Sequence, residues 1–204
     1  EMDNKIHAIP VKAINKIIED RERIEEENKR KHKKAFDDAL RLGDEIYDIL
    51  MKYTQEINCQ HIFVGSFHNG SESLEGIPYI KMDIIREVYH PTDIHELDHA
   101  FAPVYKDCEL SLLGKLPRML IQNKLLYFNV DEEGNSEMYK YDSLVIRRMI
   151  GMDIKQIALH VTQEKGVASG FVGCVRYDNE DMDLDQLALC VKELEIIHNN
   201  TKLD

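Results

Sequence analysis

The sequence has no long uninterrupted run of apolar residues. A membrane-spanning helix needs roughly 18 or more such residues in succession, and no stretch of the 204 residues approaches that length. The first residues also lack the apolar core segment of a secretory signal. We therefore expect no membrane span and no cleaved signal within these residues.

Basic residues are in deficit. There are 26 lysines and arginines against 38 aspartates and glutamates, which gives a net charge of −12. Phosphate binding requires clustered Lys and Arg, so we expect no nucleic-acid partner. The one basic cluster, residues 29–34, follows three glutamates and is typical of a solvated helix surface with ion pairs four residues apart. The alternative interpretation is a patch that binds anionic lipid or nucleic acid.

The cysteines lack the spacing of metal or redox sites. They form no CxxC pair and no zinc-finger pattern, and a disulfide framework is not expected in a domain of this size. We expect the thiols to be reduced and mostly buried, which indicates a cytoplasmic location. The four cysteines are Cys59, Cys108, Cys174 and Cys190.

No proline occurs between Pro10 and Pro78, and the pattern predicts one long helix over residues 11–57. Such a helix would extend about 70 Å, further than one domain can cover. Residues 25–34 contain no apolar side chain, whereas a strong apolar stripe follows residue 35. We therefore expect a projecting charged segment over residues 1–35 and a folded domain over residues 36–204. The stripe comprises Ala39, Leu42, Ile46, Ile49 and Tyr53.

A second apolar set adjoins this stripe on the same predicted helix. One domain face buries one stripe, so we expect the second set to be covered by a partner, in a homodimer that assembles through its helices. The C-terminal helix would add Cys190 and Ile197 to the paired surface. The adjoining set is Phe36, Leu40, Tyr47 and Leu50.

The rest of the chain alternates predicted strands and helices, which indicates an α+β fold. The expected strands are residues 61–68, 79–89, 125–130, 154–162 and 167–177. The expected helices are 110–123, with a kink or break at Pro117, 143–150 and 184–197. Residues 69–76 and 92–108 are expected to be loops. The last two strands are apolar on both faces, so we expect their hairpin near the middle of a sheet that is covered on both sides.

Motifs that carry catalytic chemistry are few. There is neither a Walker loop nor a GxGxxG. Residues 95–99 read HELDH and match HExxH, in which His95 and His99 would hold zinc and Glu96 would act as general base. Asp98 and the nearby Pro103 both oppose a buried two-turn helix, so we predict that this segment is not a preformed metal site.

A cysteine nucleophile is formally available if Cys108 or Cys174 meets His160, but cysteines in strands usually fill a core. We therefore predict that the protein is not an enzyme.

Several segments together resemble the GAF domain. Residues 154–161 resemble the strand at the edge of the GAF pocket, residues 170–175 resemble the returning strand, and residues 183–194 resemble the closing helix. Residues 66–70 followed by 76–78 resemble GAF-like proteins encoded by bacteriophages and prophages. The likeness covers roughly residues 36–199.

The resemblance implies a central antiparallel sheet of about five to six strands, flanked by helices and preceded by a long N-terminal helix. GAF domains cup small molecules such as cyclic nucleotides, tetrapyrroles, haem or small metabolites, and the cofactor of this chain stays unassigned. No Cys-His pair of the bilin-attachment kind is present. The residues that the resemblance places in the ligand pocket are Ser66, His68, Asn69, Tyr79, Lys81, Tyr127 and His160.

These observations favour a non-catalytic GAF-like module that senses a small molecule and dimerises through its helices. The alternative is a phage-encoded structural or interaction protein without a ligand. A zinc metallopeptidase built on the HELDH segment is the third hypothesis.

Overall fold

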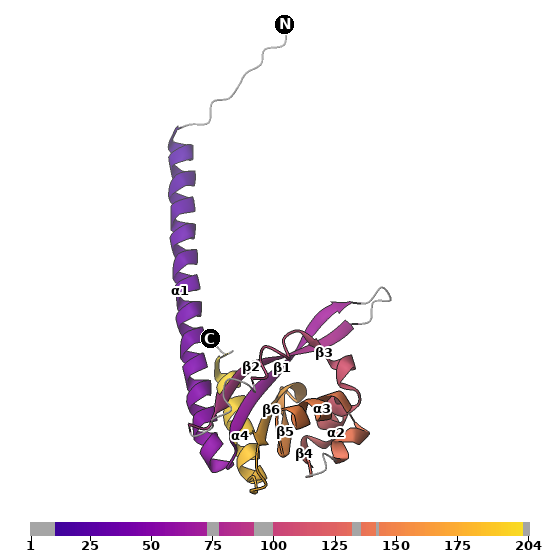
Figure 1. Ribbon diagram of the computed structural model, residues 1–204. Helices are drawn as coiled ribbons and strands as arrows, with labels where there is room; N and C mark the ends of the chain where they lie inside the picture. Colours follow the sequence, from indigo (N-terminus) through magenta and orange to yellow (C-terminus); the bar gives the residue numbers. More distant parts are fainter. Residues whose placement is uncertain (1–10, 73–77, 92–99, 132–135, 142, 202–204) are drawn as a thin grey trace. The chain divides into compact units, whose positions relative to one another are not determined.

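The computed structural model describes residues 11–72, 78–91, 100–131, 136–141 and 143–201 (Figure 1). It divides the chain into two compact units, residues 1–44 and residues 45–204, and helix α1 (Val11–Glu56) belongs to both. The boundary expected after residue 35 lies earlier on the same helix and stays a prediction. Among the described helices, none combines the length and the apolar character needed to cross a membrane.

The charged part of α1 carries a ladder of ion pairs, each between residues four positions apart. The pairs join Glu25 to Lys29 at 2.8 Å and residues 27 and 31 at 3.3 Å, with a looser pair at 3.7 Å between residues 26 and 30. All six side chains are exposed to solvent, so each pair stabilises the helix only weakly. Three cations of the basic cluster, Lys29, Arg30 and Lys31, are therefore paired along their own helix, as the sequence predicts.

The second unit is built on one six-stranded antiparallel sheet, in the order β3-β2-β1-β6-β5-β4. Three strands precede the first short helices, and three follow them (Figure 1). The strands are β1 (His61–Glu72), β2 (Pro78–Tyr89), β3 (Cys108–Glu109), β4 (Leu125–Asn129), β5 (Gln156–Glu164) and β6 (Val167–Arg176). The expected α+β architecture is confirmed.

The β5–β6 hairpin lies inside the sheet, with β1 on one side and β4 on the other. Its two-residue turn, Lys165-Gly166, has φ values of 51° and 81°, so both residues adopt the left-handed conformation that a tight hairpin turn requires. Both faces of the hairpin are apolar and covered. The predicted position of this hairpin is confirmed.

Each face of the sheet packs against its own helical layer. On one face lie the C-terminal part of α1 and helix α4 (Leu184–Thr201), which bury Leu50 and Leu187 against Val172 and Cys174. The other face carries α2 (Leu116–Asn123), α3 (Ser143–Gly151) and two short 3₁₀ helices, η1 (Leu110–Leu113) and η2 (Glu137–Lys140) (Figure 1). We call these the α1/α4 face and the α2/α3 face.

Three expectations from the sequence are corrected by the structure. Leu50 is 0% exposed and belongs to the core, and Cys190 is equally buried, so neither lies on a free helix surface. Strand β1 continues through Asn69–Glu72, which was expected to be a turn, because it pairs there with the start of β2. Residues 110–123 form η1 and α2, so the break expected in this helix is confirmed, and Pro117 lies in the first turn of α2, where a proline fits. Strand β3 was not predicted.

Arg176 ties the end of β6 to the beginning of the sheet. Its guanidinium is buried and donates to both carboxylate oxygens of Asp178, at 2.6 and 2.9 Å, and to Glu180 at 3.0 Å. It also donates to the Asn58 carbonyl, just before β1. Gln60 adds a bond to Asp178 at 3.0 Å. The network satisfies a cation that would be costly to bury alone.

The packing of Phe171 gives a first stability test. Its ring is 5% exposed and contacts Phe63 and Phe67 on the α2/α3 face, so Phe171→Ala should lower the free energy of unfolding by about 3–5 kcal/mol. Val167→Ala on the same strand is the control, since Val167 is 70% exposed and should cost less than about 0.5 kcal/mol. Urea unfolding measures both, and a loss below about 1 kcal/mol for Phe171→Ala would contradict its place in the core.

The Arg176 network gives a second test. Hydrogen bonding to Arg176 lowers the pKa of Asp178 below its ordinary value, despite the opposing effect of partial burial. A depressed pKa contributes stability that is present at neutral pH and is lost as pH falls through the folded-state value. Asp178→Asn should therefore be less stable than wild type near pH 6, and the difference should shrink towards about pH 3.

Urea midpoints across that range measure the effect. Asp48→Asn, the same change at an exposed position of α1, is the control for the substitution itself. A difference for Asp178→Asn that stays constant with pH would contradict the assigned role.

Candidate functional site

An apolar cavity of about 70 Å³ lies between the sheet and the helices on the α2/α3 face. Its walls come from the sheet, from the 3₁₀ helices, from α2 and α3, and from residues 101–105, which precede β3. Nearly all of the lining is carbon or sulfur. Six residues that define it are Phe63, Met82, Leu116, Met138, Met149 and Leu159.

Aromatic rings pack against one another on the cavity side of the sheet. Phe63 meets Phe101 edge-on at 4.8 Å between ring centroids, and it meets Phe171 edge-on at 6.2 Å. Two glycines make room for these rings. A Cβ at Gly65 would lie 2.3 Å from the Phe171 ring, and one at Gly173 would lie 2.3 Å from the Phe63 ring. The sequence therefore places glycine where rings cross the sheet surface closely.

The cavity is small compared with a ligand pocket. Pockets for small organic molecules measure roughly 300–1,000 Å³, whereas this cavity measures about 70 Å³. Four methionines contribute to the walls: Met82, Met138, Met149 and Met152. Methionine side chains are unbranched and adapt readily to a new neighbour. A wall of this composition can widen by changing side-chain rotamers.

Arg148 supplies the charged group among the described residues that line the cavity. It belongs to α3, near the end of the helix, and its guanidinium lies 5.4 Å from the centroid of the Tyr105 ring. This contact holds a cation against an aromatic face at the cavity rim. The site therefore combines apolar walls with one positive charge.

A buried His61–Glu87 pair supports one wall of the cavity. The His61 side chain is fully buried, its Nε2 lies 3.3 Å from Glu87 Oε2, and its ring stacks on Tyr89 with centroids 4.1 Å apart. Glu87 also accepts hydrogen bonds from the backbone N–H groups of Phe101, at 2.8 Å, and Ala102, at 3.2 Å. The pair thus anchors the segment that carries Phe101 and Tyr105 into the cavity wall.

The protonation of Glu87 reflects two opposing effects. Partial burial raises the pKa of its carboxyl, but the bonds from His61 and from the two backbone N–H groups outweigh burial and lower the pKa overall. Glu87 is therefore held as a carboxylate acceptor. Neither residue could be identified from the sequence, because the only signal was a histidine and a glutamate at the ends of two predicted strands.

The predicted pocket residues whose side chains are described lie on the face of the sheet opposite the cavity. Side chains alternate along a strand, and Phe63, Gly65 and Phe67 face the cavity, so Ser66 and His68 face away from it. The same alternation around Met82 on β2 and around Leu126 and Leu159 on β4 and β5 turns Lys81, Tyr127 and His160 to the α1/α4 face.

The structure brings some of these residues together and separates others. His68 and Lys81 are direct partners across β1 and β2, whereas Tyr127 and His160 lie on β4 and β5, with β6 in between. The His160 imidazole interacts locally, with Nδ1 2.8 Å from the Val161 carbonyl oxygen. The side chain of Asn69 lies outside the described residues.

The remaining predicted site residues are also outside the described part of the chain: the side chain of Tyr79, and His95 and His99 of the HELDH segment. Two predictions from the sequence therefore stay predictions. One is ligand binding by the seven residues named from the GAF resemblance, and the other is that the HELDH segment is not a preformed metal site.

The cysteines are free, and three of them lie in the core of the α1/α4 face. A hydrogen bond with Cys59, together with burial, raises the pKa of the Cys174 thiol far above its ordinary value. Burial likewise raises the pKa of Cys190. A nucleophile must be a thiolate, so these thiols suit core packing rather than catalysis.

No protein-family model matches the chain, and no curated protein sequence matches it. Solved structures do resemble it. The GAF domain/HD domain protein from Geobacter sulfurreducens has a TM-score of 0.54 at 15% identity, over 80% of this chain and 95% of that chain. The phycocyanobilin-bound GAF domain of a cyanobacterial phytochrome has a TM-score of 0.54 at 14% identity, over 85% of this chain and 93% of that one.

A phycoerythrobilin-bound GAF domain, also from a cyanobacterial phytochrome, has a TM-score of 0.53 at 14% identity, over 79% of this chain and 87% of that chain. Likeness at this level of identity shows the fold alone. Residues 45–204 therefore adopt a GAF-like fold: six antiparallel strands with a helical layer on each face.

Proposed function

We propose that the protein is a non-catalytic sensing or regulatory module that binds an apolar small molecule in the cavity of the α2/α3 face. The observation that carries this proposal is the combination of apolar walls and a rim arginine in one cavity. Two solved structures of the same fold are described as holding a bilin. A weakly anionic, largely apolar ligand would fit the chemistry of the lining.

The ligand enters by displacing side chains rather than by filling existing space. Because the cavity measures about 70 Å³, a ligand of ordinary size requires the methionines on η2 and α3 to change rotamer. Such a rearrangement would couple ligand occupancy to the position of α3. This coupling is what a sensing module needs, since a ligand shifts an equilibrium only by binding one arrangement better than another.

The proposal also includes a homodimer assembled through helices. Exposed apolar side chains occur on α1 at Phe36, Leu40 and Tyr47, and on α4 at Leu189 and Ile196. Phe36, Leu40 and Tyr47 are four and seven positions apart and so share one face of α1, which supports a partner surface on that helix. A two-fold arrangement would cover the same residues on both chains.

A second candidate function is a phage-encoded structural or interaction module without a ligand. The small volume of the cavity favours it, since a domain that only packs has no need of space for a ligand. Both candidates place the protein in the cytoplasm, in keeping with its four free thiols. The zinc metallopeptidase rests entirely on residues outside the described part of the chain, and no observation supports it.

Ligand binding is tested with 1-anilinonaphthalene-8-sulfonate, an apolar ring system that carries one negative charge. Wild type should bind one equivalent with the fluorescence increase of a buried probe. Met149→Phe narrows the cavity and should weaken binding at least tenfold. Ile150→Phe, the same enlargement at the neighbouring exposed position of α3, should bind like wild type.

Thermal unfolding must stay cooperative in all three proteins, because partly folded states also bind this probe. Equal binding by Met149→Phe and wild type, or no binding by wild type, would overturn the cavity proposal. Native mass spectrometry of the purified protein tests the same point independently, since a retained organic mass supports a ligand.

The dimer is tested by light scattering at micromolar concentrations. We expect twice the chain mass of 23.8 kDa for wild type. Tyr47→Glu and Leu189→Glu each place a charge in the proposed interface and should shift the mass towards the monomer without loss of folding. Val167→Glu, at an exposed position of the hairpin, is the control. A wild-type mass of 23.8 kDa at every concentration would refute the dimer.

A further inference from the structure

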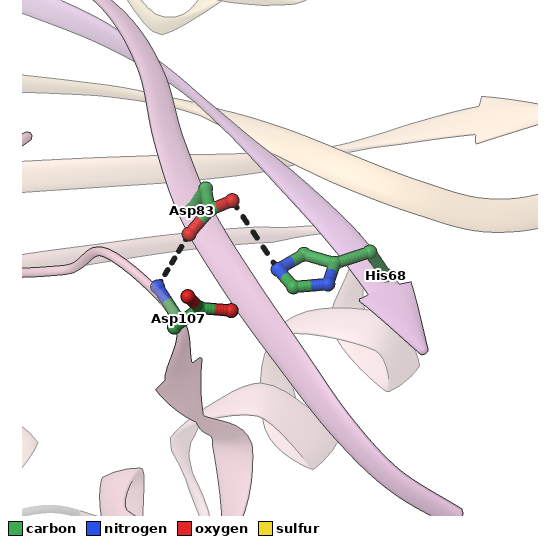
Figure 2. A group of neighbouring side chains, drawn as sticks. All are labelled: His68, Asp83 and Asp107. Carbon is green, nitrogen blue, oxygen red and sulfur yellow. Dashed lines mark hydrogen bonds and ion pairs between the residues drawn. The ribbon is translucent and has the colours of Figure 1, made fainter. Parts of the chain in front are cut away.

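We propose that His68, Asp83 and Asp107 form a binding site for a divalent transition-metal ion, for which Zn²⁺ is the probe of choice. Figure 2 shows the three side chains converging, with the His68 imidazole directed at the Asp83 carboxylate. The site lies on the opposite face of β1 and β2 from the cavity, and it stands whether or not the cavity binds a ligand.

The sheet register brings the ligands together from distant parts of the sequence. His68 on β1 is opposite Lys81 on β2, and Ser66 is opposite Asp83, so His68 and Asp83 are diagonal neighbours on one face. Asp107 directly precedes β3, which pairs with Lys81 and Met82. The three groups therefore come from three adjacent chain segments, which makes their relative positions a property of the folded sheet.

The spacing of the donor atoms suits a small metal ion. His68 Nε2 lies 3.3 Å from Asp83 Oδ2, and one ligand atom from each of the three residues lies within 4.8 Å of the others. In a tetrahedral site with Zn–N and Zn–O bonds of about 2.0–2.2 Å, donor atoms are separated by about 3.3–3.6 Å. The His68–Asp83 pair already has this separation. Asp107, the most exposed of the three, needs only a side-chain adjustment to complete the set.

Hydrogen bonding orients one of the carboxylates in advance. The backbone N–H of Asp107 donates to Asp83 Oδ1, which leaves Oδ2 directed at the imidazole. The bond depends on a left-handed backbone at Asp107, with φ of 51°, a conformation that Asp tolerates better than most residues. A polar contact that fixes the orientation of a ligating carboxylate is typical of metal sites.

The charge balance also favours a cation. Asp83 and Asp107 bring two negative charges close together, and the neighbouring ammonium of Lys81 lies 3.7 Å from Asp107 Oδ1. This ion pair is partly exposed and contributes little. A divalent ion would neutralise both carboxylates at once, while the long Lys81 side chain can turn towards solvent.

The experiment uses the 204-residue chain, which is treated with a chelator and titrated with Zn²⁺ by calorimetry, with metal content measured after dialysis. Wild type should bind one equivalent at this site, and Zn²⁺ should raise its unfolding temperature. His68→Asn and Asp83→Asn should each weaken that binding at least tenfold, because even residues that merely orient a ligand contribute about 10–100-fold. Asp107→Asn, an exposed change with little risk to folding, should weaken binding in the same way.

Two controls separate this site from other sources of zinc affinity. His198→Asn removes the imidazole of another His–carboxylate pair, in which His198 Nε2 lies 3.4 Å from Glu164, and it should bind Zn²⁺ like wild type. The double variant His95→Asn/His99→Asn should also bind one equivalent of Zn²⁺. The proposal would be overturned if the double variant lost zinc binding while His68→Asn kept it. Unchanged binding in all three ligand variants, or no binding by wild type, would overturn it as well.

Discussion

The inner strands β1 and β6 are apolar on both faces, and the rest of the domain depends on covering them. On the α1/α4 face, Leu50 and Leu187 pack against Val172 of β6. On the other face, the Phe63 and Phe171 rings lie across positions where Gly65 and Gly173 have no side chain. Because both layers are needed, the long helix α1 cannot be only an appendage: its last turns are part of the core.

The same interlocking of rings and glycines explains why the cavity is small. Aromatic side chains of β1 and β6 occupy part of the sheet surface, and the space that remains is bounded on the helical side by leucines and by the methionines of η2 and α3. The rigid half of the site is thus the sheet, and the adaptable half consists of η2 and α3. The buried His61–Glu87 pair strengthens the rigid half, because it holds residues 101 and 102 against β2 through three interactions with one carboxylate.

Much of the fold could be predicted from local patterns, whereas the site could not. The β5–β6 hairpin follows from its turn residues and its two-sided apolar pattern. The faces to which the side chains of β2 point do not follow from any local pattern. Gly65 of β1 pairs with Ile84, but the preceding Val64 pairs with Arg86, so β2 has one extra residue there. This bulge reverses the alternation of side chains between the two faces of the sheet along β2. As a result Lys81 faces away from the cavity while Glu87, six positions later on the same strand, faces His61. Strand β3 could not be predicted either, because a strand of two residues shows no periodic pattern of apolar side chains.

The β1–β2 hairpin connects the two proposed sites, because neighbouring residue pairs between these strands face opposite sides of the sheet. Phe67 pairs with Met82 and both line the cavity, while the next pair, His68 with Lys81, faces the other side beside Asp83. An ion bound to His68 and Asp83 would fix the separation of β1 and β2 at this point. A ligand that moves Met82 would act on the same separation. The two binding free energies are therefore coupled to the extent that both depend on one arrangement of the hairpin, and by linkage any such coupling is reciprocal.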